Sequence, residues 1–128
     1  MSVVLTGHLG FIGSALLKRL ESMGKDVFCF DVKEDPKRWL TKDDEVDTFY
    51  HIGAMSGIGE CEEDSTLSIR NNVESTEAAA KIALSKNARL VFTSSAAAER
   101  CTSLYGMTKR MGEDIISYYV RAKGLNAS

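Results

Sequence analysis

Residues 2–13 read Ser-Val-Val-Leu-Thr-Gly-His-Leu-Gly-Phe-Ile-Gly, and this stretch decides the fold. The apolar, β-branched run over residues 2–6 predicts a buried strand. The spacing G-x-x-G-x-x-G places Gly7, Gly10 and Gly13 where that strand ends and a helical pattern begins, which Gly24 closes. Glycines at such a junction let the backbone turn tightly and approach a pyrophosphate, which binds the free N–H groups and the positive end of the helix. No Lys-Ser/Thr pair follows Gly13, so the turn is not the phosphate loop of nucleotide hydrolases.

Strand-like and helix-like segments alternate along the rest of the chain. Apolar runs at residues 27–31, 46–52 and 89–93 predict further strands, and long helices are predicted over residues 64–85 and 103–123. Asp35 before Pro36 predicts an N-cap and a brief helical turn. The predicted strands are too apolar for either face of the sheet to be exposed to solvent, and helices join them. This pattern indicates an α/β fold: a minimal Rossmann-like, doubly wound parallel sheet of about four strands with helices on both faces. The right-handed crossover rule predicts the strand order 2-1-3-4.

The composition is that of one ordinary globular domain, which we expect to span residues 1–128. The chain is 44% hydrophobic and 27% charged, with a net charge of −2, so no basic surface for nucleic acid or for an anionic membrane is expected. The N-terminus has no positively charged region and no long apolar run, which argues against a signal peptide or a membrane span. Cys29, Cys61 and Cys101 are widely spaced and fit free thiols, so we expect a cytoplasmic protein.

No metal site is expected. The chain has two histidines and no H-E-x-x-H motif. His8 occupies a variable position of the glycine turn, where a solvated loop residue is the simpler interpretation. The acidic run at residues 60–64 resembles a metal cluster, but we expect a solvated loop leading into the next helix, whose N-terminus favours acids.

Asp31 stands at the end of the second predicted strand. A carboxylate at that place accepts hydrogen bonds from the ribose of an adenosine and repels a 2′-phosphate, which favours NAD over NADP. The alternative interpretation is a glycine-rich turn followed by an unrelated, solvated acid. The strand before the glycines, the helix after them and the position of Asp31 together favour a dinucleotide site.

Two further motifs carry groups that can do chemistry. Tyr105 and Lys109 are four residues apart in a predicted helix, so the phenol and the ammonium share a face. A nearby cation favours the phenolate and lowers the pKa of a tyrosine toward the range of a general acid or base. Ser94 and Ser95 follow the fourth predicted strand, at the edge where open α/β sheets bind ligands. Taken alone, the first motif is a surface pair and the second is a turn.

In this order, the glycine turn, the strand-end acid, the serines and the Tyr-x-x-x-Lys motif resemble the short-chain dehydrogenase/reductase superfamily, in particular its extended branch of nucleotide-sugar epimerases and dehydratases. The sequence Thr-Gly-x-x-Gly-Phe-Ile-Gly at residues 6–13 is typical of that branch, as are His-Ile-Gly-Ala at 51–54 and Asn-Asn-Val-Glu-Ser-Thr at 71–76. Thr-Ser-Ser-Ala at 93–96 completes the set, and the resemblance covers nearly the whole chain.

The resemblance implies NAD as the cofactor and hydride transfer at a secondary alcohol or ketone carbon, with a nucleotide sugar as one candidate small-molecule substrate. It implies that Tyr105 is the acid/base and that Lys109 binds the nicotinamide ribose and lowers the pKa of the tyrosine. Ser95, with Ser94 as its neighbour, would orient the substrate oxygen. The implied cofactor-binding residues are Gly7, Gly10 and Gly13, Phe11 and Ile12 through their backbone N–H groups, and Asp31, Gly53, Ala54, Tyr105 and Lys109.

The chain also departs from the family. The residues between Asp31 and Asp47 are too few for the strand and helix that the family inserts there, so its acid-plus-aliphatic pair beside adenine is missing or replaced, with Asp43-Asp44 or Trp39 as candidates. Glu99-Arg100 stand where the family has a Tyr-Gly pair. The chain stops after the last predicted helix, which predicts a shortened form without the C-terminal substrate lobe, either natural or truncated. The alternative function is therefore a non-catalytic NAD-binding or interaction module.

We also expect a homodimer formed through the helices at 64–85 and 103–123. The fourth strand would leave one edge of the sheet bare, and bare edges invite pairing or need cover. The last helix carries Ile116, Tyr118 and Val120 beside its main apolar stripe, which is more apolar surface than one sheet contact buries. In the family, this pair of helices commonly forms a four-helix interface across a two-fold axis. The alternative is a monomer whose extra apolar residues are scattered over the surface.

Overall fold

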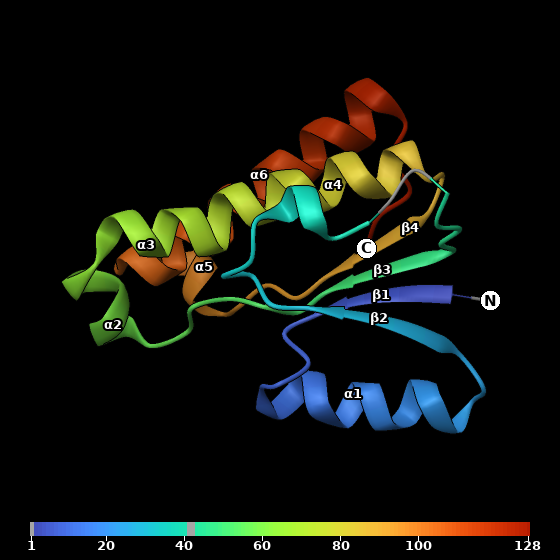
Figure 1. Ribbon diagram of the computed structural model, residues 1–128. Coiled ribbons are helices and arrows are strands. Elements are labelled where there is room, and N and C mark those ends of the chain that lie inside the picture. Colours follow the sequence, from blue (N-terminus) through green and yellow to red (C-terminus); the bar gives the residue numbers. More distant parts are fainter. Residues whose placement is uncertain (1, 41–42) are drawn as a thin grey trace.

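The computed structural model describes residues 2–40 and 43–128 of the chain (Figure 1). Its four strands form one parallel sheet in the order β2-β1-β3-β4. The strands are β1 (Ser2–Thr6), β2 (Asp26–Phe30), β3 (Thr48–His51) and β4 (Arg89–Phe92). The predicted α/β class, the parallel pairing and the strand order are therefore confirmed.

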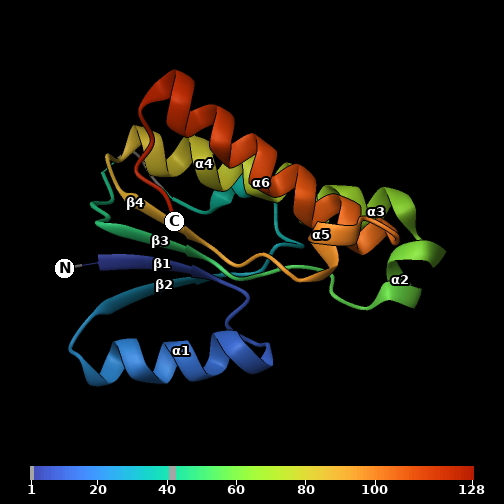
Figure 2. The same cartoon turned by 180° about the vertical axis from the view of Figure 1, so that it is seen from behind.

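Helices cover both faces of the sheet, as predicted. α1 (Phe11–Ser22) lies on one face, whereas α4 (Ser75–Ser85) and α6 (Leu104–Lys123) lie on the other (Figures 1 and 2). On the side of α4, Val4, Phe49 and Leu90 are neighbours in the strand register and are fully buried. In the same core cluster, α4 contributes small, fully buried side chains that let the helix lie close to the sheet, those of Ala79, Ala80 and Ala83.

The helix predicted over residues 64–85 is continuous but not uniform. α3 (Ser65–Ile69) leads into a π-helical turn, η2 (Arg70–Glu74), which is followed by α4. Turns of this kind are rare and occur frequently at functional sites. Asn71 and Asn72 lie on this turn, and both are only 2% exposed. The wider turn therefore places two amide side chains in the interior, close to the sheet edge where ligands bind in this class of fold.

The solvated loop predicted at residues 60–64 is wrong. α2 (Ile58–Glu63) occupies most of it, and the carboxylate of Asp64 caps α3 by accepting a hydrogen bond from the N–H of Leu67 at 3.0 Å. Cys61 is fully buried on α2, so the segment of residues 60–64 has a buried face as well as a solvent-exposed face. α5 (Ala97–Arg100) is a second short helix that was not predicted. Within residues 2–40 and 43–128, no helix is long and apolar enough to cross a membrane.

The expected bare edge at β4 is also wrong, because residues 125–128 lie along it. α6 ends at Gly124, whose φ of 75° is in the left-handed region that favours glycine, and the chain then reverses. The N–H of Leu90 donates to the carbonyl of Asn126 at 2.8 Å, and the N–H of Ser128 donates back to the carbonyl of Leu90 at 3.0 Å. Leu125 is buried in the core. The chain thus covers the edge of its own sheet.

The short link between β2 and β3 has a different role from the one expected. Asp35 caps the turn η1 (Pro36–Arg38), as predicted, by accepting a hydrogen bond from the N–H of Lys37 at 3.0 Å. Trp39 follows and is fully buried, with its ring 6.0 Å from that of Phe49 and 6.3 Å from that of Phe30. Trp39 is therefore a core residue and is not free to contact adenine.

Asp43 and Asp44, the other candidates for the adenine pair, lie at the wrong end of the sheet. They precede the first residue of β3, whereas ligands bind at the carboxyl ends of parallel strands. The carbonyl of Asp44 accepts a hydrogen bond from Nζ of Lys86, which follows the last residue of α4, at 2.6 Å. Neither proposed replacement for the adenine pair is therefore correct.

Candidate functional site

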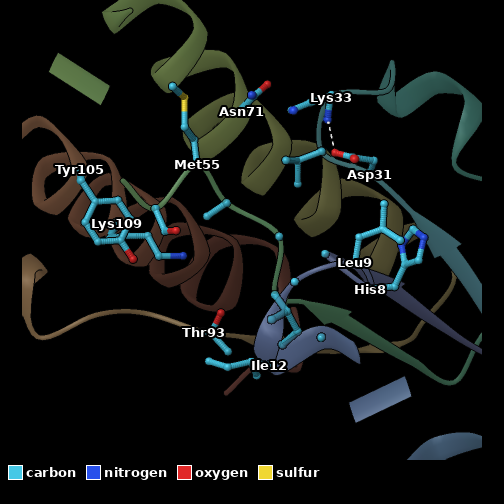
Figure 3. Close-up of a pocket in the computed structure, with 18 of the residues that line it drawn as sticks. His8, Leu9, Ile12, Asp31, Lys33, Met55, Asn71, Thr93, Tyr105 and Lys109 are labelled. Carbon is cyan, nitrogen blue, oxygen red and sulfur yellow. Dashed lines mark hydrogen bonds between the residues drawn. The ribbon is translucent and has the colours of Figure 1, made fainter. Parts of the chain in front are cut away.

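A cavity of about 610 Å³ lies at the carboxyl ends of the strands. This volume is within the range of about 300–1,000 Å³ that is usual for small-molecule sites. Figure 3 shows the turn after β1 on one side of it and Tyr105 and Lys109 of α6 on the other. Of the residues predicted to act in catalysis or in cofactor binding, those that line the cavity are Gly7, Gly10, Ile12, Gly13, Asp31, Gly53, Ala54, Tyr105 and Lys109.

Phe11 and Ser95 are the two predicted site residues that do not line the cavity. The side chain of Phe11 is 95% exposed, but its backbone N–H, the group expected to act, belongs to the first turn of α1, where N–H groups have no partner within the helix. His8 was expected to be a solvated loop residue; instead, it lines the cavity.

Two glycines of the turn, Gly7 and Gly13, are packed so closely that a side chain would have no room. A Cβ on Gly13 would lie 1.9 Å from the carbonyl oxygen of Gly7, and a Cβ on Gly7, whose φ is +81°, would lie 2.6 Å from Cα of Gly53. The N–H of Gly7 donates to the carbonyl of Phe30 at 3.2 Å, which ties the turn to the end of β2. Gly10, the N-cap of α1, has no side chain to satisfy the first N–H groups of the helix. These donors are therefore available to an anionic ligand.

A buried hydrogen-bond network holds Gly53 against this turn. The hydroxyl of Thr76 donates to the carbonyl of Asn72 at 2.8 Å, so it accepts from Nε2 of His51, 3.0 Å away. This assigns the ring proton of His51 to Nε2 and leaves Nδ1 to accept from the hydroxyl of Thr6 at 2.8 Å. Oγ1 of Thr6 in turn accepts from the N–H of Gly53 at 3.2 Å.

The network requires a neutral imidazole. Complete burial lowers the pKa of His51 to about 3, and the nearby charge of Lys109 acts in the same direction. His51 was noted in the sequence only as part of a family motif. Its position at the end of an apolar strand is the signal that could have indicated a buried, hydrogen-bonded role.

Asn72 of the π-helical turn anchors the segment that follows Gly53. Its amide makes two hydrogen bonds to the backbone of Met55, accepting from the N–H at 2.7 Å and donating to the carbonyl at 3.0 Å. The same amide nitrogen donates to the hydroxyl of Thr108 on α6 at 3.0 Å. Asn72 therefore links the cavity wall around Ala54 to the helix that carries Tyr105.

Lys109 is unusually buried for a lysine. It is 4% exposed, and Nζ lies 4.6 Å from the centroid of the Phe92 ring, within the range of a cation–π interaction. Burial lowers the pKa of Lys109 to about 8, although the carboxylate of Glu113 acts in the opposite direction. Lys109 and Tyr105 line the same cavity, so a buried amine and a phenol both face the space where a ligand would bind.

The two serines after β4 have different surroundings. Ser94 lines the cavity, and its hydroxyl forms a short hydrogen bond to Oε1 of Glu113 on α6. Oγ of Ser95 instead accepts from the N–H of Ala97 at 3.2 Å, at the start of α5. Glu113 was missed in the sequence, although its position four residues after Lys109 places it on the same face of the helix.

Asp31 lies on the rim of the cavity, where β2 ends. Its carboxylate accepts a hydrogen bond from the N–H of Lys33 at 3.0 Å, which is drawn in Figure 3. Its own N–H donates to the side chain of Glu34 at 3.1 Å. In the described part of the chain, no group of three or more histidine, cysteine and acidic side chains is arranged to hold a metal ion.

A family model described as the NAD dependent epimerase/dehydratase family matches residues 3–128. The chain belongs to this family. Because this family is described as NAD dependent, the predicted cofactor is confirmed at the level of the family. Among curated proteins, no sequence relative matches the chain.

Solved structures share the fold of this epimerase/dehydratase chain. MoeE5 in complex with UDP-glucose and NAD is 22% identical, with a TM-score of 0.85 over 100% of this chain and 52% of its own. UDP-glucose 4-epimerase from Thermotoga maritima is 17% identical, with a TM-score of 0.83 over 99% of this chain and 53% of its own. The dTDP-glucose 4,6-dehydratase DesIV from Streptomyces venezuelae is 18% identical, with a TM-score of 0.80 over 99% and 54%. The chain spans about half the length of the structures that it matches.

The packing of the turn predicts different effects for two substitutions of glycine by alanine. Gly13→Ala should lower the free energy of unfolding by about 1–3 kcal/mol, because the new methyl group would overlap the carbonyl of Gly7. Gly59→Ala is the control, because its Cβ would meet open space in α2; it should raise the stability by roughly 0.5–1 kcal/mol. Urea unfolding followed by circular dichroism measures both. Equal stabilities of the two variants would contradict this account of the turn.

The lowered pKa of Lys109 predicts how stability changes with pH. Between pH 8 and 10.5, the unfolded chain holds a proton on Lys109 that the folded chain has released, so the free energy of unfolding rises with pH. Relative to Lys109→Met, the wild type should therefore gain stability between pH 7 and 10. Paired urea titrations at several pH values measure the difference, and Lys18→Met on the surface of α1 controls for the loss of one charge. A wild type that loses stability relative to Lys109→Met over this range would show that the sign is wrong.

Proposed function

We propose that the chain binds NAD in the 610 Å³ cavity and carries out hydride transfer at a secondary alcohol or ketone carbon of a small molecule, with nucleotide sugars as the substrate class. The observation that carries this proposal is the convergence of the glycine turn, Asp31, Tyr105 and Lys109 on one cavity. The glycine turn follows β1, Asp31 follows β2 and the Tyr-Lys pair lies on α6, so no local sequence constraint brings these three parts together.

The cavity wall fits a dinucleotide in three respects. The glycine turn leaves no room for a Cβ at Gly7 and Gly13 and offers the first N–H groups of α1 to a pyrophosphate. Asp31 provides a carboxylate for ribose hydroxyls. Nδ1 of His8 and Oδ1 of Asn71 belong to residues that line the cavity, and both atoms are buried without a hydrogen-bond partner within the described part of the chain. Buried polar atoms without partners are costly, and a polar ligand would satisfy them.

When bound, NAD supplies the redox chemistry, and the chain supplies proton transfer and orientation. We assign to Tyr105 the transfer of a proton to or from the substrate oxygen. We assign to the ammonium of Lys109 the binding of the nicotinamide ribose. The sequence favours Ser95 as the hydroxyl that orients the substrate oxygen. Because Ser94 is the serine that lines the cavity, variants of both positions are required to distinguish them.

Solved neighbours support the substrate class. MoeE5 is described in complex with UDP-glucose and NAD, and the Thermotoga maritima epimerase with UDP-glucose. The chain spans about half the length of these proteins. A second candidate is a module that binds NAD and catalyses no reaction, which the position of Ser95 outside the cavity lining favours. We further propose that the described residues act as one domain in a reducing, cytoplasmic compartment, since Cys29, Cys61 and Cys101 are free.

The proposed chemistry predicts that Tyr105→Phe lowers turnover by about 10²–10⁴-fold while NAD affinity is nearly unchanged, because the phenol acts on the reacting oxygen. Lys109→Ala should lower both. Tyr118→Phe, an exposed tyrosine on the same helix, is the matched control and should change neither. Calorimetry measures NAD and NADP binding, and chromatography of the sugar products, together with NADH absorbance, measures turnover with UDP- and dTDP-sugars.

The outcomes of this experiment separate the two candidates. Full activity of Tyr105→Phe would refute the assigned role of the phenol. Binding of NAD without turnover on any of the sugars would favour the non-catalytic module. Absence of NAD binding would overturn both, and tighter binding of NADP than of NAD would refute the role of Asp31 in cofactor choice.

We propose that the chain forms a homodimer through α6 and the helix that begins with α3. The covered edge of β4 gives no support, so the proposal depends on the helix faces alone. Met107, Met111 and Tyr118 on α6 are 43%, 44% and 51% exposed, and Ile69 on α3 is 40% exposed. Burial of these side chains against a second copy would remove apolar surface from water.

Light scattering at micromolar concentration should give twice the chain mass of 14.0 kDa. Met111→Asp should reduce this to the mass of one chain, because a charge would be buried in the interface. Met23→Asp introduces the same charge at an exposed methionine beyond the end of α1 and should leave the dimer intact. A wild-type mass near 14.0 kDa would contradict the dimer.

A further inference from the structure

A second cavity, of about 270 Å³, adjoins the first one. Val32 and Lys33 line both cavities. The second cavity lies between residues 32–36, which follow β2, and the π-helical turn, from which Arg70 and Glu74 contribute to its wall. Its volume is just below the usual range for a small-molecule site, so it suits one ring system and not a whole dinucleotide.

The junction between the two cavities is at Asp31. This residue lines the first cavity, and the next two residues, Val32 and Lys33, line both. The hydrogen bonds from the N–H of Lys33 to Asp31 and from the N–H of Asp31 to Glu34 hold this segment in a tight turn. In a dinucleotide, the adenine is attached directly to the ribose. A ribose bound by Asp31 would therefore leave its base beside Val32 and Lys33.

The wall of the second cavity has the chemistry that an adenine ring requires. Val32 and Pro36 provide apolar surface for the faces of the ring. The guanidinium of Arg70 is planar and stacks on aromatic faces, and a carboxylate such as that of Glu74 accepts a hydrogen bond from an exocyclic amino group. Among the described residues, neither Arg70 nor Glu74 has a side-chain hydrogen bond or ion pair, so both are available to a ligand.

We propose that this second cavity is the adenine subsite of the chain, with Val32 and Pro36 providing apolar contact, Arg70 stacking and Glu74 accepting from the amino group. The inference rests on the proposed binding of NAD. It accounts for the short link between β2 and β3, which lacks the family's acid-plus-aliphatic pair. Trp39 is buried in the core and Asp43-Asp44 lie at the opposite end of the sheet, so the π-helical turn provides what the missing segment would have provided.

Calorimetry with ADP-ribose tests the role of Arg70 without any measurement of turnover. Arg70→Ala should weaken ADP-ribose binding about 5–100-fold, which corresponds to the loss of one stacking interaction. Arg70→Lys should weaken it to a similar degree, since lysine keeps the charge and lacks the planar group. Arg19→Ala, which removes an exposed arginine from α1, is the matched control and should bind as the wild type does.

The exchange of adenine for hypoxanthine tests Glu74, because hypoxanthine has a carbonyl where adenine has the amino group. The wild type should prefer NAD to nicotinamide hypoxanthine dinucleotide, and Glu74→Ala should lose that preference. Arg70 and Glu74 are exposed, so both variants should unfold at the wild-type temperature.

The results distinguish failure of this inference from failure of the proposed function. If the wild type and Arg70→Ala bind ADP-ribose equally, the adenine lies elsewhere, and the binding of NAD still stands. If Arg70→Lys restores full affinity, Arg70 contacts a phosphate and the assigned stacking is wrong. An unchanged preference in Glu74→Ala would remove Glu74 from the subsite. If the wild type binds neither ADP-ribose nor NAD, the inference fails together with the proposed function.

Discussion

Three backbone segments meet at the carboxyl edge of the sheet with no side chain between them. The turn after β1 lies against Gly53 beyond β3, and the start of α1 lies against the carbonyl of Gly7, at distances that exclude a Cβ. This contact determines how far α1 stands from the sheet and leaves its first N–H groups open to the cavity. Because the N–H of Gly7 also bonds to the end of β2, the same contact brings Asp31 to the cavity rim.

A buried hydrogen-bond network connects this close backbone contact to the helices on the face of the sheet opposite α1. His51 is neutral, joins Thr6 to Thr76 and thereby connects the ends of β1 and β3 to the helix above them. Asn72, one turn earlier in the helix, holds the segment after Gly53 and also bonds to Thr108 on α6. A network of this kind is stable only when each member has a partner. The positions of Gly53 and of the helix that carries Tyr105 therefore depend on the same set of hydrogen bonds.

Burial of the charged Lys109 side chain is the energetically unfavourable feature of the site. A lysine that is 4% exposed has lost most of its hydration, and its lowered pKa shows that burial outweighs the influence of Glu113. The ring of Phe92 offers the ammonium partial compensation, and it approaches α6 closely because residue 112 is a glycine; a Cβ there would lie 2.8 Å from the ring. The cation beside Tyr105 thus depends on packing contributed by β4.

By itself, the sequence determined the α/β class, the strand order, the glycine turn, the position of Asp31 at a strand end and the shared helix face of Tyr105 and Lys109. The strand order follows from the general handedness of crossover connections, and the others depend on local periodicity or on a spacing of a few residues. Only the tertiary structure decided that residues 125–128 cover the edge of β4, that Trp39 enters the core and that Ser94, not Ser95, lines the cavity. It also decided that the π-helical turn comes to lie opposite residues 32–36. These outcomes depend on contacts between segments far apart in the chain, whose distances are set by how the helices pack on the sheet, and no local pattern encodes them.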